Sequence, residues 1–456
     1  MLKRASLLSI FCLWAALAFA GQPATNAIWM IGDGMGPSAM GFFMEAVRNT
    51  DLPEYPTKQS TLEQFINAST TGFYFNNTYD TVVTDSACAA TQMACGALSR
   101  PSRIGIDAQG RSLETLLEEA YKQGKSIGVV TDVYVADATP AGFLAHTDSR
   151  KNRREIARQL VDSKAQVILG GGLKYFNKHE NKQLLQEATQ KGWQVVQDRK
   201  SLAKVKTGRV LGLFADEAMP FYGDKKAYPQ TPTLLEMTQK AIELLSQNEK
   251  GFVLMVEAGK VDWALHDNEG GPTLWEMVNL DETLSYLWNW TKKQGNTLLY
   301  LNADHETGVP SFEYRHLDKQ TLAHKSAQGE MLYGKDTDYV NYPYYQRLFA
   351  HKHLLYYVFE DFKKLPEREQ TVQRLQQMCD KAVGRPTDLH LNGQVPSYEQ
   401  LVQNLNKAQG LVWSTGNHSS GMLIGVAYGP GSELFSGVYH NTDLKNKFEQ
   451  ALGFAK

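Results

Sequence analysis

Residues 26–38, NAIWMIGDGMGPS, decide the fold: an apolar run typical of a buried strand ends in Asp33, which lies among closely spaced glycines. Gly32, Gly34 and Gly36 form G-x-G-x-G rather than the G-x-G-x-x-G of a dinucleotide-binding loop. A pyrophosphate would also need bare backbone N–H groups here, whereas Asp33 offers an anionic carboxylate. An acidic side chain at a strand end is better suited to a cation.

The same pattern of apolar strand, polar tip and helix recurs along the chain. Apolar residues at helical spacing predict helices over residues 112–124, with Ser112 as N-cap, over 231–251, with Thr231 as N-cap, and over 273–295. Apolar runs predict strands over residues 125–132, 252–259 and 296–303, each directly after one of these helices. This alternation predicts an α/β fold with a large, mostly parallel central sheet that helices flank on both faces.

Polar residues stand at the ends of the predicted strands. They are Asp33, Asp137, Glu257, Asp304 and His305. Open α/β sheets bind ligands beyond the carboxyl ends of their strands, so we expect these five side chains to converge in one crevice.

Length and charge limit the function classes. The chain has 456 residues, with 47 basic and 49 acidic side chains, so nothing indicates a nucleic-acid or lipid-headgroup partner. We expect residues 21–456 to form one catalytic unit with an insertion at about 310–400, which is rich in tyrosine and charge. That insertion fits a position near the site or at a subunit contact, and a local aromatic core fits equally well.

Residues 1–20 have the features of a signal peptide. Lys3 and Arg4 precede an apolar core too short to span a bilayer, and AFA precedes Gly21 as a cleavage site. No later apolar run reaches transmembrane length, so we expect an exported protein, periplasmic or secreted. The three cysteines that remain after cleavage are too few and too scattered for a disulfide framework.

Three segments carry candidate metal ligands. Asp262 and His266 are four residues apart, so on a helix both side chains share a face and can bind one metal ion. Asp304 and His305 are adjacent directly after a strand, and His418 lies in a loop of small residues. Each segment alone also fits a purely structural role, as a solvated helix face, a strand-end cap or a surface histidine.

Ser86, in VVTDSACAATQMACG, stands at the predicted N-terminus of an alanine-rich helix. The free N–H groups and the helix dipole there favour an alkoxide and an anionic ligand. The alternative is that Ser86 is an ordinary N-cap. The sequence around it lacks G-x-S-x-G, which argues against a lipase-type nucleophile.

Six segments together resemble the alkaline phosphatase family. They are IGDGMG, TDSACAAT, DATPAGFLAHTDSR, EAGKVDWALH, NADHETG and GNHSSG, in the order found in that family, and the tail VAYGPGSELFSGVYHNTDL also looks like its C-terminal segment. The resemblance covers residues 26–445, with 310–400 matching least.

The resemblance implies a role for each candidate residue. It implies Ser86 as the nucleophile, Arg150 as the phosphate-binding arginine and Asp85 as the residue that orients it. It further implies two Zn²⁺ ions and one Mg²⁺ ion per subunit, small phosphate monoesters as substrates and a homodimer. The first zinc would be held by Asp262, His266 and His418, the second by Asp33, Asp304 and His305, and the magnesium by Asp33, Thr139 and Glu257, with Asp137 hydrogen-bonded to its water shell.

Trp263 departs from the pattern of the best-studied bacterial members, which have Lys at this position where vertebrate members have His. An indole cannot hold phosphate through water as a cation can, so we expect weaker product retention. For Arg150, the alternative interpretation is an exposed charge in the basic run RKNRR.

Two other function classes compete with a phosphomonoesterase. A phosphodiesterase or sulfatase of the same superfamily is disfavoured by Ser86, by Arg150 and by the Thr139/Glu257 pair, and residues 84–90 lack the C/S-x-P-x-R context of sulfatases. An exported protein that binds metal or phosphate without turnover would have no need of a nucleophile such as Ser86.

Overall fold

A ten-stranded sheet forms the centre of the computed structural model, which describes residues 21–178, 181–313, 315–316, 337–338, 343–387, 389, 391 and 393–454. The predicted signal peptide, residues 1–20, lies outside the described residues. The strands lie in the order β16 (Gly437–His440), β2 (Thr70–Phe75), β15 (Leu423–Tyr428), β8 (Thr297–Asn302), β1 (Asn26–Gly32), β7 (Phe252–Ala258), β3 (Ser126–Tyr134), β4 (Val167–Gly171), β6 (Arg209–Leu213) and β5 (Trp193–Val196). β15 runs antiparallel to both of its neighbours, and the other neighbouring pairs are parallel.

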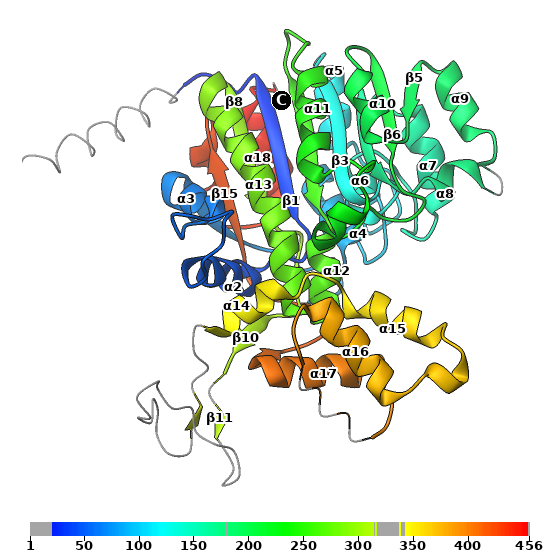
Figure 1. The fold of residues 1–456 in the computed structure, drawn as a ribbon. Coiled ribbons are helices and arrows are strands. Elements are labelled where there is room, and N and C mark those ends of the chain that lie inside the picture. The colour runs from blue at the N-terminus through cyan, green and yellow to red at the C-terminus, as the bar shows by residue number, and fades with distance from the viewer. Residues whose placement is uncertain are drawn as a thin grey trace, which may run out of the picture.

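Helices cover both faces of this sheet, as predicted. α11 (Leu234–Leu245) and α13 (Gly270–Gln294) lie on one face, and α5 (Leu116–Lys122), α6 (Ala138–Gly142) and α18 (Asp443–Ala451) lie on the other (Figure 1). Further helices surround these layers: α2 (Pro37–Arg48), α3 (Thr61–Ala68), α4 (Ser86–Cys95), α7 (Arg153–Asp162), α8 (Lys174–Asn177), α9 (Leu184–Gln190), α10 (Arg199–Lys204) and α12 (Lys260–His266).

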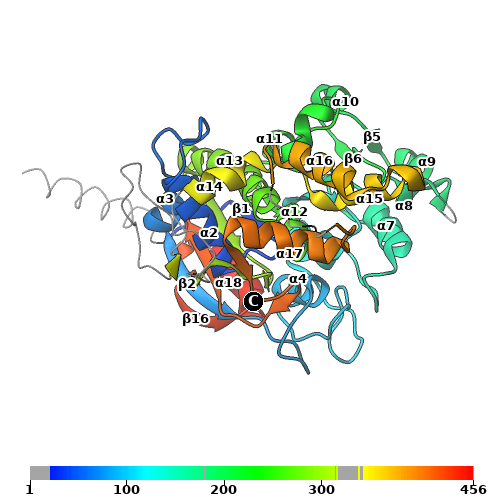
Figure 2. The same ribbon diagram turned by 60° about the horizontal axis from the view of Figure 1, so that its bottom comes forward.

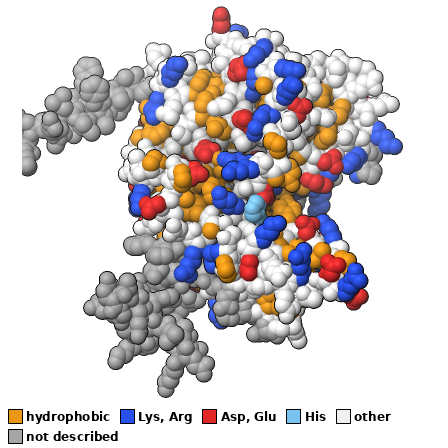
Figure 3. Space-filling view, in the orientation of Figure 1, with side chains coloured by type: hydrophobic (Ala, Val, Ile, Leu, Met, Phe, Trp, Pro, Cys, Tyr) orange, Lys and Arg blue, Asp and Glu red, His pale blue; other side chains and the backbone are white. Residues whose placement is uncertain are grey.

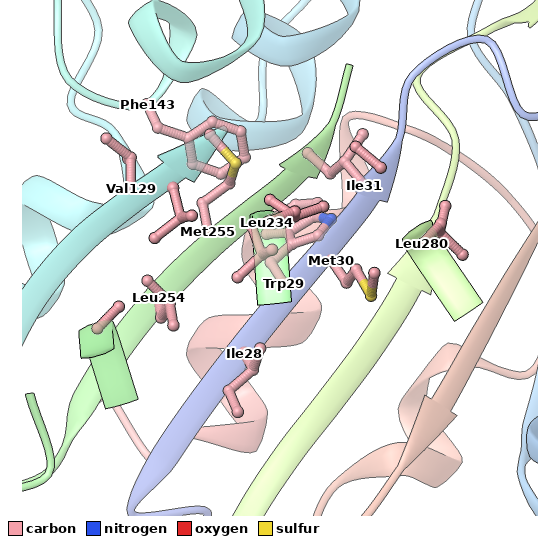
Figure 4. Packing of buried hydrophobic residues seen from close by; sticks show 14 of the residues in the cluster. Ile28, Trp29, Met30, Ile31, Val129, Phe143, Leu234, Leu254, Met255 and Leu280 are labelled. Carbon is pink, nitrogen blue, oxygen red and sulfur yellow. The ribbon is translucent and has the colours of Figure 1, made fainter. Parts of the chain in front are cut away.

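β1 lies at the centre of the core and is buried along its whole length. Figure 4 shows Ile28, Trp29, Met30 and Ile31 among apolar side chains of neighbouring strands and helices. The Trp29 ring stacks on Phe448 at 4.2 Å between centroids and meets Phe143 edge-on at 5.3 Å. A strand buried on both faces reads as a continuous apolar run, which explains why residues 26–32 show no alternation of polar and apolar side chains.

The N-caps predicted for two helices were wrong by a few residues. The N-cap of α5 is Thr115 rather than Ser112, and the N-cap of α11 is Thr233 rather than Thr231. In both helices the threonine accepts a hydrogen bond from the backbone N–H of a glutamate three residues later, and that glutamate bonds back to the threonine N–H. Such a capping box satisfies two free N–H groups at once, so it outcompetes a lone hydroxyl upstream.

The segment predicted as an insertion forms mainly helices. Its described strands and α-helices are β10 (Pro310–Phe312), β11 (Arg315–His316), β12 (Thr337–Asp338), α14 (Pro343–Ala350), α15 (Leu355–Lys363), α16 (Val372–Val383) and α17 (Tyr398–Gln409). β13 (Leu411–Trp413), which pairs with β10, follows α17. The helices α15, α16 and α17 share a small apolar core and form a separate layer next to α12 (Figures 1 and 2).

The surface and the cysteines agree with the sequence. Basic and acidic side chains are interspersed over the face shown in Figure 3, as the near-neutral charge suggests. Within the described residues, no helix combines the length and apolar character needed to cross a membrane. Cys88, Cys95 and Cys379 are all free thiols and buried.

Candidate active site

Strand register brings the predicted acidic residues to one edge of the sheet. Ile31 of β1 lies opposite Glu257 of β7 on one side and opposite Asn302 of β8 on the other. Asp33 and Asp304 both lie two residues beyond this row, at the carboxyl ends of their strands. Glu257 lies inside β7 rather than past its end, where it is 1% exposed.

The first group of possible metal ligands consists of Asp33, Asp304 and His305, whose donor atoms lie within 4.8 Å of one another. His305 Nε2 is 3.1 Å from Asp304 Oδ2 and 3.5 Å from Asp33 Oδ1. The same nitrogen lies 3.1 Å from the Oγ atom of Ser86. The predicted nucleophile therefore directly adjoins this group.

The second group contains Asp262, His305 and His418, again within 4.8 Å of one another. His266 Nε2 lies 3.1 Å from His418 Nε2 and 3.4 Å from Asp262 Oδ2. The structure thus brings together the predicted set of Asp262, His266 and His418. It also stacks the ring of His305 on that of His418, with 3.5 Å between centroids.

Backbone carbonyls orient two of these imidazoles. His266 Nδ1 bonds the carbonyl oxygen of Gly416, and His418 Nδ1 bonds that of Thr84, each at 2.8 Å. A carbonyl oxygen only accepts, so Nδ1 carries the proton and Nε2 keeps a lone pair toward Asp262. This second hydrogen bond is the usual way in which a protein fixes a metal-binding histidine.

Glu257 and Thr139 are buried beside the first group. Thr139, on α6, is 1% exposed, and its hydroxyl makes no hydrogen bond within the described residues. Glu257 accepts a hydrogen bond from Thr131, yet burial, reinforced by the charge of Asp137, raises its pKa to about 8. A carboxyl that is hard to ionise here would gain from a nearby cation.

Ser86, Asp85 and Arg150 meet at the start of α4. Asp85, not Ser86, is the N-cap: its Oδ1 atom accepts from the backbone N–H groups of Cys88 and Ser102, each at 3.0 Å. Its Oδ2 atom binds Arg150 Nη1 at 3.3 Å. Ser86 is therefore the first helical residue and is free of the capping role that was its structural alternative.

Asp137 holds the other side of the Arg150 guanidinium. Its Oδ1 atom lies 3.4 Å from Arg150 Nη2 and also 3.4 Å from Arg153 Nη2. Burial alone would lower the pKa of Arg150, but the charges of Asp137 and Asp85 outweigh it and raise that pKa. Two carboxylates thus fix the guanidinium plane, as a residue that binds phosphate oxygens in pairs requires.

The electrostatics of the first group favour a cation. Burial raises the pKa of Asp33 well above its usual value, and the neighbouring carboxylates of Asp304 and Asp262 raise it further. Burial lowers the pKa of His305 well below 6.5. Asp33 Oδ1 and Asp304 Oδ2 are buried and accept no hydrogen bond within the described residues. Such unsatisfied, crowded oxygens beside a neutral imidazole suit a divalent metal ion.

Trp263 lies on α12, directly after the proposed ligand Asp262. Its half-buried ring lies 5.6 Å from that of Tyr134 and 4.5 Å from Lys260 Nζ. It also packs against Phe221 and Leu354. The indole therefore belongs to an aromatic wall beside the site.

Sequence reasoning missed two residues that contact the predicted set. Thr307 donates a hydrogen bond to Asp262 and also meets His305, and its only signal was its place two residues after that histidine. Arg153 binds Asp137, but in the sequence it was one more charge in the run RKNRR. Both contacts join residues far apart in the chain or spaced irregularly, so no pattern revealed them.

Comparison with known proteins decides the family. The family model described as alkaline phosphatase matches residues 24–454. The chain belongs to the alkaline phosphatase family. Membership makes it a phosphoric monoester hydrolase, and the recognition made from the six sequence segments is confirmed.

Relatives of this family match over nearly the whole chain. Alkaline phosphatase 4 of Bacillus subtilis is 32% identical over 432 residues, covering 92% of this chain and 87% of its own. A solved structure of a cold-active alkaline phosphatase from the psychrophile Shewanella sp. has a TM-score of 0.76 at 28% identity, covering 94% and 99% of the two chains. The Thermus thermophilus alkaline phosphatase has a TM-score of 0.81 at 24% identity over 96% and 93%, which supports the fold.

Proposed function

We propose that the protein hydrolyses phosphate monoesters through a phosphoserine on Ser86, with two zinc ions and one magnesium ion per subunit. The observation that carries the proposal is the contact of Ser86 Oγ with His305, which belongs to both groups of possible metal ligands. A hydroxyl beside two cation sites is poised for activation as a nucleophile.

The donor sets fit these ions. Asp262, His266 and His418 would hold one zinc, and Asp33, Asp304 and His305 the other, since imidazole and carboxylate ligands suit zinc. Asp33, Thr139 and Glu257, an all-oxygen set, would hold magnesium, with Asp137 beside its water shell. Asp137 also binds Arg150 and Arg153 in the structure, so it would link that water shell to the phosphate-binding arginine.

When bound, the zinc ions lower the pKa of a hydroxyl or water and neutralise charge on the attacking and leaving oxygens. The chain's own residues supply the rest. Ser86 Oγ gives up its proton and bonds to phosphorus, while the ester P–O bond breaks and the alcohol takes a proton. Water then cleaves the phosphoserine, which returns the Ser86 hydroxyl and releases inorganic phosphate.

Arg150 binds two phosphoryl oxygens with its planar fork, a geometry that lysine does not provide. Asp85 and Asp137 hold that fork in place through the contacts described above. Asp85 also caps α4, so the nucleophile and the arginine are positioned by the same carboxylate.

We further propose that residues 1–20 direct export to the periplasm or the exterior, that residues 21–456 form one catalytic unit, and that the protein is a homodimer. The signal-peptide pattern supports export. The dimer rests on resemblance to the family.

Metal analysis combined with activity tests the proposal. Purified protein is expected to contain zinc and magnesium, to release p-nitrophenol from p-nitrophenyl phosphate, and to lose both metal and activity on chelation. Ser86→Ala should reduce turnover at least about a thousandfold, whereas Ser420→Ala, an exposed serine of the His418 loop, should not.

Two results would contradict the proposal. One is labelled phosphate trapped on a residue other than Ser86 after acid quenching. The other is faster hydrolysis of bis(p-nitrophenyl) phosphate than of the monoester, which would favour a phosphodiesterase.

A further inference from the structure

A pocket of about 450 Å³ has His266 in its wall. Three segments supply the remaining lining: the corner between α12 and α13, the helix α17, and residues 410–416 with β13. Glu313, just past β10, completes it. The pocket therefore joins the core of the enzyme to the helical layer of the insertion.

Three imidazoles in contact with one another lead from Ser86 to this pocket. Ser86 Oγ contacts His305, the His305 ring stacks on His418, and His418 Nε2 lies 3.1 Å from His266 Nε2. In an in-line displacement the leaving group departs on the side opposite the nucleophile. The alcohol of a substrate attacked by Ser86 would therefore leave on the side of His266, the residue that this pocket shares with the proposed metal ligands.

Hydrogen bonds hold the walls together. Tyr398 of α17 donates its hydroxyl to Glu269 Oε1 at 2.9 Å, and Asn406 of the same helix donates to the carbonyl oxygen of Asn268 at 2.8 Å. Glu269 is fully buried and also accepts from the backbone N–H of Leu355, at the start of α15. The insertion is therefore fixed to the corner that carries His266, which makes the pocket a built feature.

The lining favours a cation. Its carboxylates belong to Asp267, Glu313 and Glu399, and the lysine among the lining residues is Lys407. Asn406 is 6% exposed, and its Oδ1 atom accepts no hydrogen bond within the described residues.

Two aromatic residues, Tyr398 and Trp413, also line the pocket. Carboxylates and aromatic rings are groups that bind ammonium ions. A leaving group with an anionic substituent would instead meet like charge.

We infer that this pocket receives the leaving group of the substrate and selects phosphate monoesters of alcohols that carry an ammonium group. The inference rests on the proposed function, because it uses Ser86 as the nucleophile. Glu313 and Glu399 act as specificity-determining residues, since both are exposed and lie outside the proposed metal ligands.

Paired substrates test this inference on the zinc- and magnesium-loaded enzyme. The kcat/KM for phosphoethanolamine is divided by that for glycerol 1-phosphate, whose alcohol is uncharged. The double variant Glu313→Gln/Glu399→Gln should lower this ratio about threefold to tenfold, as expected for two partly solvated charges. Lys407→Gln should raise it, and added salt should weaken the preference of the unmodified enzyme.

The matched control is Glu249→Gln, an exposed glutamate on the turn before β7, at the other end of that strand from Glu257. Its ratio should equal that of the unmodified enzyme. A double variant that hydrolyses glycerol 1-phosphate with an unchanged ratio would overturn the inference alone. Absence of phosphate release from every ester, p-nitrophenyl phosphate included, would overturn the proposed function and the inference with it.

Discussion

Replacing Thr307 by valine tests how the proposed metal ligands are held. The Thr307 hydroxyl donates to Asp262 Oδ1 at 2.6 Å and lies 3.1 Å from His305 Nδ1. The hydroxyl donates its proton to Asp262, so its oxygen accepts a hydrogen bond from the Nδ1–H of His305. His305 Nε2 therefore keeps its lone pair toward Asp33 and Asp304. One hydroxyl thereby orients a ligand of each proposed zinc site.

The expected magnitude follows from burial and charge. Thr307 is fully buried, and valine matches its shape but makes neither hydrogen bond. A hydrogen bond to a charged group contributes about 1.5–3 kcal/mol. Since 1.4 kcal/mol is about a factor of ten in an equilibrium constant, we expect the zinc dissociation constant to rise about 10- to 100-fold, the range typical of residues that orient metal ligands.

Competition with a chelator of known affinity measures that constant, and the melting temperature of the metal-free protein is recorded in parallel. Thr238→Val is the matched control, because Thr238 is also fully buried but its hydroxyl makes no hydrogen bond within the described residues. A Thr307→Val protein that binds zinc within about twofold of the unmodified enzyme would refute the reasoning. A lower melting temperature with unchanged zinc affinity would show that the hydroxyl only supports the fold.

Three further predictions concern product binding, substrate binding and pH. Trp263→Lys should lower the inhibition constant for inorganic phosphate, because an ammonium can hold phosphate through water; an unchanged constant contradicts this. Arg150→Lys should raise KM for p-nitrophenyl phosphate about tenfold or more, since lysine lacks the paired donors held by Asp85 and Asp137, and a KM equal to that of the unmodified enzyme would disprove it. Hydrogen bonds to Glu118 and to a backbone carbonyl raise the pKa of His146 above 6.5, so the protonated form stabilises the fold at low pH and this contribution is lost as pH rises through the folded pKa. In urea unfolding, His146→Gln should therefore lower the free energy of unfolding more at about pH 5.5 than at about pH 8.5, by up to about 1 kcal/mol. An equal loss at both pH values would rule this out.

The insertion illustrates a question that the sequence left open. Its aromatic residues fitted a local core, a position near the site or a subunit contact. The described helices have their own apolar core, around Leu355, Phe362 and Leu375. They are also bonded, through Tyr398 and Leu355, to Glu269 in the corner that follows His266. The local core is therefore observed, the helices also lie next to the corner that follows His266, and the subunit contact stays a prediction.

The sequence by itself determined the layers of this protein and the identities of its candidate ligands. Apolar runs such as residues 26–32 can only be buried, and strands that alternate with amphipathic helices must lie parallel beneath them. Asp33, Asp304 and His305 then fall at strand ends by chain order alone. These are local properties, because each depends only on residues that are close together in the sequence.

Only the tertiary structure decided which atoms meet. Asp85, rather than Ser86, caps α4. Its carboxylate is also held by Ser102 and Arg150, which lie elsewhere in the chain. The pocket beside His266 likewise depends on α17, more than a hundred residues downstream. Hydrogen bonds between distant segments leave no periodic trace in a sequence, because their geometry is fixed by packing and not by spacing along the chain.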